Sequence, residues 1–207
     1  MLAIIAPGQG AQTPGMLAPW IEDPESKALL VEWSDAIGLD LVHLGVHADA
    51  DEIKDTANAQ PLIVAAGLLS ARALNVSGKF SFVAGHSVGE ITAAAIAGVL
   101  TPLDAMKLVR TRGVEMAKAA ALAPAGMSAV LGGDRDVVLA AIADAGLVAA
   151  NDNGAGQIVA AGELQALTQL GENPPTGARV RALAVAGAFH TSFMAPAVEP
   201  LRKLAAT

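Results

Sequence analysis

A five-residue segment, Gly85-His86-Ser87-Val88-Gly89, constrains the fold more than any other part of this chain. It matches G-x-S-x-G, the pattern of a sharp turn from a strand into a helix. The apolar run SFVA precedes the segment and EITAAAIAG follows it, so the flanking sequence predicts the same order. Side chains in place of the two glycines would clash in such a strained turn. We therefore expect an α/β fold in which Ser87 stands at the start of a helix.

Ser87 is a candidate nucleophile, and the alternative is a glycine-rich turn that happens to hold a serine. The free N–H groups and the dipole at a helix N-terminus favour developing negative charge. The Val88 N–H is therefore the natural first donor of an oxyanion hole, while His86 is expected to be structural. A second glycine-rich loop, PGQGAQ, follows the apolar run at residues 2–6, and Gln9 in it is a candidate second donor. Taken alone, GQG favours a structural turn.

Composition excludes several classes of protein. The chain has no cysteine, which removes disulfides, thiolate catalysis and cysteine metal sites, and we expect no metal. Its net charge of −7 disfavours nucleic-acid binding, which needs clustered Lys and Arg. The N-terminus lacks a basic region before its short apolar run, and no stretch approaches the roughly 20 apolar residues of a membrane span. We expect a cytoplasmic protein that binds no membrane.

The order of predicted elements divides the 207-residue chain in two. Segments at 127–187 alternate as β-α-β-β-α-β, which is the ferredoxin-like arrangement. We therefore expect an inserted ferredoxin-like subdomain at 127–187, and a core formed by 1–126 and 188–207. Within the core, a helix is predicted after Gln60-Pro61, and another is predicted to begin at Thr101-Pro102.

Four short motifs then occur in one order along the chain: GQGAQ near the N-terminus, GHSVGE around Ser87, RTRG at 110–113 and AFHT at 188–191. This set resembles the malonyl-CoA:acyl-carrier-protein transacylases and the acyltransferase domains of fatty-acid and polyketide synthases. The resemblance covers essentially the whole chain. It implies an α/β-hydrolase-like core with a ferredoxin-like subdomain, in agreement with the division above.

The resemblance also implies roles for individual residues. It identifies His190 as the base, which from sequence alone is equally well a core histidine. It identifies Arg112 as the partner of the malonyl carboxylate, since a guanidinium fork matches a carboxylate. Arg110 and Arg112 lie about 200° apart on a helix and cannot both face one pocket; the alternative is two solvent arginines, and Arg110 is expected to matter little. Phe189 belongs to a motif that resembles the malonyl-selecting version, and Gln60 and Asn153 are pocket-wall candidates or structural amides.

The function implied is transfer of a malonyl group from malonyl-CoA to the phosphopantetheine thiol of acyl carrier protein through a malonyl-serine intermediate. Malonyl-CoA is then a substrate, no cofactor is bound, the partner is acyl carrier protein, and we expect a monomer. Family members continue beyond the point where this sequence stops, so it resembles a member truncated at its C-terminus. The alternatives are a serine esterase or thioesterase with the same turn, and an inactive fragment. The sequence does not separate fatty acid from polyketide synthesis.

Overall fold

The computed structural model describes residues 1–75 and 78–206 of the chain. It divides into two compact units, the first formed by Met1–Val114 with Lys203–Thr207 and the second by Glu115–Arg202. Both a parallel and an antiparallel sheet are present, so the predicted α/β class is confirmed. The predicted domain limits at 126/127 and 187/188 stay a prediction.

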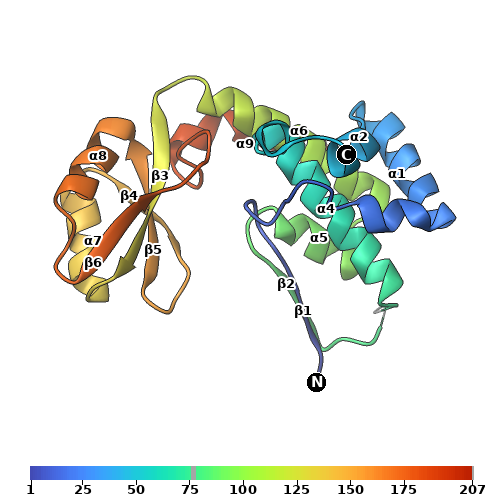
Figure 1. Ribbon diagram of the computed structural model, residues 1–207, viewed down its shortest axis with the longest axis horizontal. Coiled ribbons are helices and arrows are strands. Elements are labelled where there is room, and N and C mark those ends of the chain that lie inside the picture. The colour runs from blue at the N-terminus through green and yellow to red at the C-terminus, as the bar shows by residue number, and fades with distance from the viewer. Residues whose placement is uncertain (76–77, 207) are drawn as a thin grey trace. The chain divides into compact units, whose positions relative to one another are not determined.

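The first unit contains a parallel pair of strands with helices packed on it (Figure 1). The pair is in register from Ala3↔Phe82 to Ala6↔Gly85. The elements in chain order are β1 (Ala3–Ala6), η1 (Ala18–Glu22), α1 (Pro24–Ile37), α2 (Leu41–Val46), α3 (Ala50–Ile53), α4 (Thr56–Ala73), β2 (Phe82–Gly85), α5 (Gly89–Ile96) and the first part of α6 (Pro102–Ala120).

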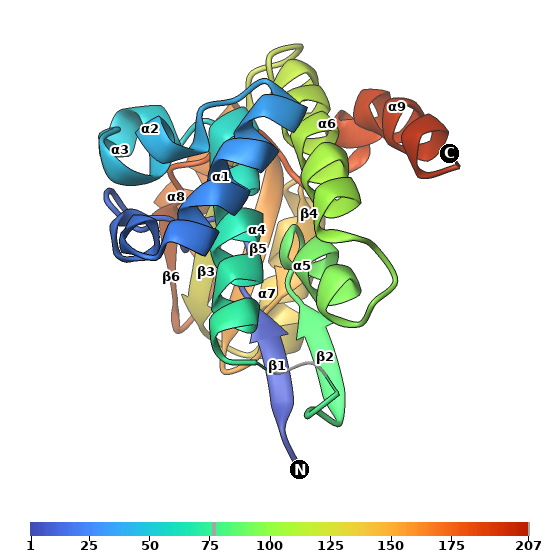
Figure 2. The same ribbon diagram turned by 90° about the vertical axis from the view of Figure 1, so that its right-hand side faces the viewer.

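Helix α4 is the centre of the first unit, as Figure 2 shows from the side of the strand pair. Ten of its residues are buried, and they contribute to a core that also contains Leu30 and Trp33 of α1 and Met106 and Val109 of α6. Because apolar residues surround α4 on most of its circumference, the helix packs against several elements at once. This packing fixes the position of the side chains on the first turn of α4, which begins at Thr56.

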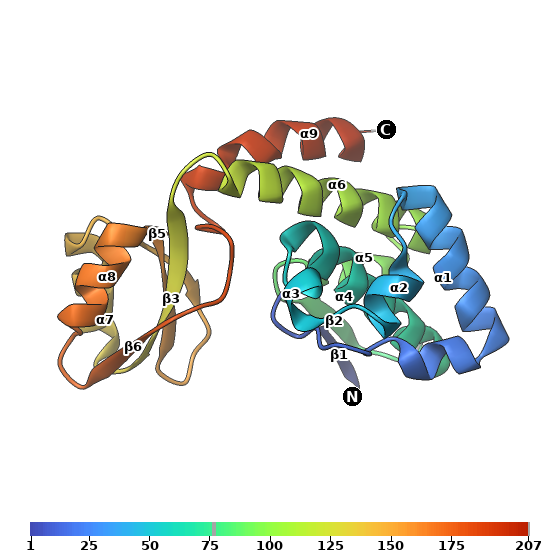
Figure 3. The same ribbon diagram turned by 45° about the horizontal axis from the view of Figure 1, so that its top comes forward.

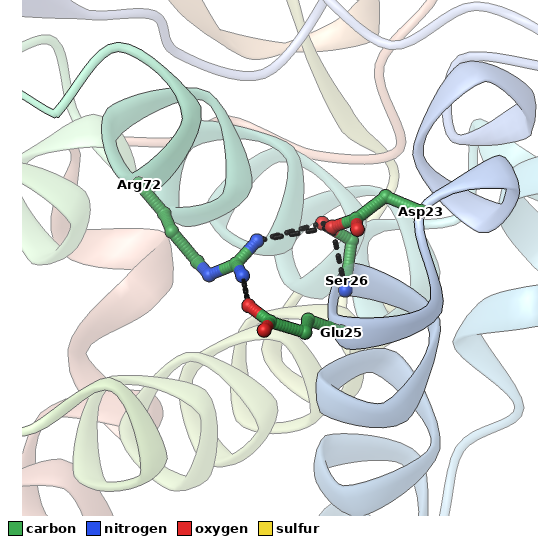
Figure 4. Close-up of polar contacts among 4 residues, drawn as sticks. All are labelled: Asp23, Glu25, Ser26 and Arg72. Carbon is green, nitrogen blue, oxygen red and sulfur yellow. Dashed lines mark hydrogen bonds and ion pairs between the residues drawn. The ribbon is translucent and has the colours of Figure 1, made fainter.

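A polar cluster joins the C-terminal part of α4 to the start of α1 (Figure 4). Asp23 caps α1: one of its carboxylate oxygens accepts from the Ser26 N–H at 3.0 Å and from the Ser26 hydroxyl at 2.7 Å. Arg72 donates to Asp23 at 3.1 Å and also pairs with Glu25. The hydrogen bonds from Ser26, followed by Arg72, lower the pKa of the Asp23 carboxyl. The cluster holds α1 and α4 together at the edge of their shared core.

The second unit is a four-stranded antiparallel sheet with strand order β4-β5-β3-β6 (Figure 3). Its elements are β3 (Ala125–Gly132), α7 (Arg135–Asp144), β4 (Val148–Asp152), β5 (Gln157–Glu163), α8 (Leu164–Glu172) and β6 (Ala178–Ala182), followed by η2 (Ser192–Met194) and α9 (Ala195–Ala205), which continues into the first unit. The order β-α-β-β-α-β predicted from the sequence is therefore present. The last strand ends at Ala182, five residues before the predicted end of the subdomain at 187.

The two central strands of this sheet are buried on both faces. Val130 of β3 and Ile158 of β5 pack against α7 and α8. Met127 and Val159 point the other way and pack with Met116, Phe189 and Met194. Alternation along a strand sends successive side chains to opposite faces, so burial of both sets explains why the middle of each strand is apolar, Ser128 excepted.

In the part of the chain that the structure describes, no helix combines the length and apolar character needed to cross a membrane.

Candidate active site

Ser87 lies at the turn between β2 and α5, as the sequence predicts. Its backbone φ is 54°, in the left-handed region that serine rarely adopts. The Glu90 N–H donates to the Ser87 carbonyl at 3.0 Å and closes the first turn of the helix directly after it. A serine held in this conformation carries a strain of order 1–3 kcal/mol. Such strain is typical of functional positions.

The two glycines of the turn are required by close backbone contacts. A Cβ on Gly85 would collide with the backbone of Gly89, and a Cβ on Gly89 would collide with the carbonyl oxygens of Ala6 and Pro7. The His86 N–H donates to the Ala6 carbonyl at 3.0 Å, which ties the turn to the end of β1. The turn is thus held against the loop that carries Gln9.

Arg112 of α6 reaches the candidate nucleophile directly. Its Nη2 donates to Ser87 Oγ at 3.2 Å, and its Nη1 donates to Gln60 Oε1 at 2.7 Å. Both acceptors are neutral. None of the ion pairs among the described residues involves Arg112. Within the described part of the chain, the guanidinium therefore stands beside Ser87 without forming an ion pair with a carboxylate.

Burial lowers the pKa of the Arg112 guanidinium, and the negative charge of Glu90 opposes that effect. Arginine is the most basic of the side chains, so Arg112 stays charged at neutral pH. A cation that has lost part of its hydration gains when an anion binds to it. The electrostatics of this site consequently favour an acyl group that carries a carboxylate.

Gln60 and Gln9 extend the same hydrogen-bonded chain away from Ser87. Gln60 Nε2 donates to Gln9 Oε1 at 3.3 Å, and Gln9 Nε2 donates to Thr56 Oγ1 at 3.2 Å. Both ends of the Gln9 amide are thus engaged. The predicted oxyanion donors are Gln9, whose backbone N–H takes no part in these two bonds, and the N–H of Val88, which is fully buried.

Pro61 explains how α4 and α6 come together at this site. Inside α4, proline has no N–H for the carbonyl four residues earlier, which belongs to Ala57. Arg110 Nη1 donates to that carbonyl at 2.9 Å instead. The alternative of two solvent arginines therefore does not hold for Arg110, because Arg110 binds the carbonyl freed by Pro61. Gly113 allows the same approach, since a Cβ there would lie 2.9 Å from the Thr56 carbonyl oxygen.

The remaining candidates lie in the second unit. His190 is exposed and has φ of 60°, so it shares the left-handed conformation with Ser87. It follows Phe189, which is buried in the core with Met127. Thr191, next in the chain, caps η2 by accepting from the Phe193 N–H at 3.2 Å. An exposed imidazole on a well-anchored turn is suited to exchange protons. The roles of His190 and Phe189 stay predictions.

Asn153 lies in the turn between β4 and β5 and is exposed. Its Nδ2 donates to Gln157 Oε1 at 2.7 Å, and its N–H donates to the Gln157 carbonyl at 2.9 Å. These contacts give Asn153 a structural part in the turn, and its role as a pocket-wall residue stays a prediction.

The sequence analysis missed Thr56, although a signal was available. It placed the start of this helix after Pro61, whereas α4 begins at Thr56 with Asp55 as its N-cap, which accepts from the Ala57 N–H at 2.7 Å. Aspartate is among the favoured N-cap residues. Recognition of that cap would have placed Thr56 and Gln60 on one face of the first turn.

Among the residues that the structure describes, no group of three or more His, Asp or Glu side chains is placed to hold a metal ion. The chemistry available at Ser87 is nucleophilic, with a cation beside the nucleophile and backbone donors at a helix start.

The chain matches the acyl transferase domain family over residues 4–207. It is 58% identical over 210 residues to the malonyl CoA-acyl carrier protein transacylase of Mycobacterium tuberculosis, with 100% of this chain and 70% of that protein covered. The chain belongs to the malonyl-CoA:acyl-carrier-protein transacylase family. The family member of Haemophilus influenzae is 37% identical over 209 residues, with 96% of this chain and 67% of that protein covered.

Solved structures of family members have the same fold. The crystal structure of MCAT from Mycobacterium tuberculosis has a TM-score of 0.96 at 57% identity, and the match covers 99% of this chain and 69% of that one. A second transacylase was solved in complex with a type II polyketide-synthase acyl-carrier protein. It has a TM-score of 0.87 at 32% identity over 98% of this chain and 68% of that one.

Proposed function

We propose that this chain transfers a malonyl group from malonyl-CoA to the phosphopantetheine thiol of acyl carrier protein, with Ser87 as the nucleophile. The observation that carries the proposal is the guanidinium of Arg112 at 3.2 Å from Ser87 Oγ. In a malonyl thioester the carboxylate carbon is only two bonds from the carbonyl carbon that is attacked. A cation that binds this carboxylate must therefore stand within a few ångströms of the nucleophile, as Arg112 does.

The first half-reaction forms a malonyl-serine. Ser87 Oγ attacks the thioester carbonyl carbon while its proton passes to His190. The N–H groups of Val88 and Gln9 bind the oxyanion of the tetrahedral intermediate. The C–S bond then breaks, and the CoA sulfur takes the proton from the imidazolium. Arg112 holds the malonyl carboxylate throughout. The proposal for His190 rests on the sequence motif and on the exposure of its ring.

The second half-reaction reverses the order. The carrier-protein thiol loses its proton to His190 and attacks the malonyl-serine, and the proton then returns to Ser87 Oγ. Acyl carrier protein as partner is supported by the complex solved for a family member. Malonyl-CoA is a substrate in this scheme and no further cofactor enters it. The similarity to malonyl CoA-acyl carrier protein transacylases supports a role in which this chain supplies extender units for fatty acid synthesis. The proposal also places the protein in the cytoplasm.

Mass spectrometry after mixing with malonyl-CoA tests the nucleophile. We expect one malonyl group on the peptide that contains Ser87, and no adduct on Ser87→Ala. Turnover of that variant should fall by roughly 10⁵- to 10⁶-fold, as for other serine nucleophiles. A malonyl adduct on Ser87→Ala would show that another residue is the nucleophile.

A comparison of acceptors separates transfer from hydrolysis. After malonyl-serine has formed, release to a phosphopantetheine thiol should greatly exceed release to water. Equal rates would instead favour the esterase or thioesterase alternative. A neutral-acyl esterase would leave the charge of Arg112 unpaired in its acyl-enzyme, which is costly for a cation with reduced hydration.

A further inference from the structure

The hydrogen bonds that begin at Arg112 form one directional chain. Arg112 donates to Gln60, Gln60 donates to Gln9, and Gln9 donates to Thr56, over distances of 2.7, 3.3 and 3.2 Å. The four residues come from α6, from the first two turns of α4 and from the loop after β1. Arg112 also donates to Ser87 Oγ, so the residue at which the chain of hydrogen bonds begins is in direct contact with the nucleophile.

The direction of the chain is set at its two ends. A guanidinium only donates, so Gln60 must turn its amide oxygen toward Arg112. The NH₂ of Gln60 then faces Gln9, whose oxygen must accept it, and the NH₂ of Gln9 is left facing α4. At that end Thr56 offers a hydroxyl oxygen, which can accept. In this orientation the Gln9 NH₂ keeps its hydrogen bond to α4 only while position 56 offers an acceptor.

Because two residues of this hydrogen-bonded chain are buried, a change in the orientation of one amide would leave a hydrogen bond unmade. Thr56 and Gln60 are each 1% exposed, so water cannot easily replace a missing partner. A flipped Gln60 amide would place its NH₂ against the donors of Arg112. Loss of the acceptor at position 56 removes the interaction that favours one orientation of Gln9, and Gln9 in turn favours one orientation of Gln60.

Thr56 is itself rigidly placed. It is the first residue of α4, directly after the N-cap Asp55. Its turn is docked on α6 by the bond from Arg110 to the Ala57 carbonyl and by the close approach at Gly113. The hydroxyl is therefore a fixed reference point for the amides that follow it.

We propose that Thr56 is a positioning residue that sets the amide orientations of Gln9 and Gln60 and thereby holds Arg112 in place to select malonyl over neutral acyl groups. The proposal rests on the proposed function, because the selectivity concerns the malonyl-serine intermediate. Thr56 touches neither substrate nor nucleophile and acts through three intervening side chains.

The test is a series at position 56 that changes acceptor strength. Thr56→Val keeps the shape and removes the hydroxyl, Thr56→Ser keeps the hydroxyl, and Thr56→Cys supplies a thiol, which is a weak acceptor. Thr92→Val is the matched control. Thr92 is also 1% exposed, and among the described residues its hydroxyl has no hydrogen-bond partner, so it contributes nothing to the chain.

Two measurements are made on each variant of the full chain. The first is kcat/KM for malonylation of Ser87 from malonyl-CoA relative to acetylation from acetyl-CoA. For Thr56→Val we expect the malonyl value to fall about three- to tenfold, the range of one net hydrogen bond, with the acetyl value little changed. Thr56→Cys should lie between Val and Ser, while Thr56→Ser and Thr92→Val should resemble the wild type. If the valine variant fails to fold, the comparison of Thr56→Ser with Thr56→Cys still tests the proposal, because only the cysteine variant should lose malonyl selectivity.

The second measurement is the NMR resonance of the Arg112 Nε–H, which needs no acyl transfer. It should shift and broaden in Thr56→Val and stay in place in Thr92→Val and Thr56→Ser. If the wild type acquires no malonyl group, the proposed function fails, and the NMR series alone decides the role of Thr56. An equal loss of malonyl and acetyl transfer, or an Arg112 resonance that is unmoved in Thr56→Val, would overturn the proposal.

Discussion

The two units of the chain differ in what they bury. Of the buried polar residues that the structure describes, Ser26, Thr56, Gln60 and Thr92 lie in the first unit and Ser128 alone lies in the second. The interior of the second unit is otherwise apolar, with small and branched side chains on both faces of β3 and β5. Buried polar groups cost stability unless they are satisfied. Near Arg112 in the first unit, Thr56 and Gln60 are satisfied by the hydrogen bonds that extend from the guanidinium.

In the interiors of the two units, the comparison teaches where a substitution should affect chemistry and where it should affect stability alone. In the first unit, helix packing and hydrogen bonding share the same few residues, so a change in packing also moves a side chain of the site. In the second unit, the sheet and its two helices form a regular core that makes no such demand. Three further experiments test this separation.

The largest effect is expected from Arg112→Ala. It removes a charge-assisted bond of about 1.5–3 kcal/mol to the malonyl carboxylate, so malonyl transfer should fall by roughly one to two decades. Acetyl transfer should hold or rise, because a neutral acyl group does not need the cation. Parallel rate measurements with the two acyl-CoA substrates check this.

Arg110→Ala is the control for Arg112→Ala. The sequence alone predicts little effect of this change, but the structure leads us to expect a loss of stability. Because Arg110 holds the carbonyl freed by Pro61, its loss should lower stability and reduce both transfers to the same extent. If Arg112→Ala also reduces malonyl and acetyl transfer equally, then Arg112 serves the fold and the comparison between the units loses its main support.

Replacement of one glycine by alanine in each unit should change the free energy of unfolding by a smaller amount, with opposite signs in the two units. Gly113→Ala in α6 places a methyl group against the first turn of α4 and should cost about 1–3 kcal/mol of unfolding free energy. Gly171→Ala in α8 meets no atom within 4 Å and should gain about 0.5–1 kcal/mol. Urea unfolding measures both.

The same pair should also separate chemistry from stability. Gly113→Ala is expected to lower malonyl selectivity, since it displaces the helix that carries Arg112. Gly171→Ala should leave selectivity at the wild-type value. A loss of selectivity in Gly171→Ala would mean that the second unit is coupled to the acyl site more strongly than its regular core suggests.

The smallest effect concerns docking of the carrier protein on the second unit. Arg179 and Arg181 are exposed on β6, on the face opposite to Val180, which packs against the core with α7. Neither takes part in an ion pair among the described residues. We predict that this basic pair contacts acidic groups of the carrier protein, so reversal of both charges should weaken transfer by roughly three- to tenfold and flatten its salt dependence.

Self-malonylation from malonyl-CoA should be unchanged by this double variant, because the small substrate does not need the patch. Stopped-flow measurement of the two half-reactions distinguishes them. If both fall together, Arg179 and Arg181 are structural and the docking surface lies elsewhere.

Much of the fold could be predicted because its signals are local. Two glycines between an apolar strand and a helix predict the turn at Ser87. The βαββαβ order of the second unit is predicted by short apolar runs that alternate with helical patterns. Thr101-Pro102 likewise marks the start of α6. Each of these features is decided by neighbours in sequence.

The contacts of Arg110 and Thr56 could not be predicted in the same way. Arg110 binds a carbonyl 53 residues earlier, which is free only because a proline lies inside a different helix. Gln9 and Thr56 are 47 positions apart and meet through the packing of a loop on α4. Partners this distant are specified by tertiary packing, and the sequence pattern around each residue contains no trace of them.

The proline inside α4 has a consequence for attempts to redesign acyl specificity. An engineer who replaces Arg112 to admit neutral acyl groups also removes the terminal donor from two glutamines whose orientation depends on it. The carbonyl of Ala57 still fixes the neighbouring arginine and hence the helix, so the backbone would not relax to repair the loss. Replacement of Arg112 by glutamine, which retains an NH₂ donor, is therefore a better starting point than alanine for a library of altered-specificity variants.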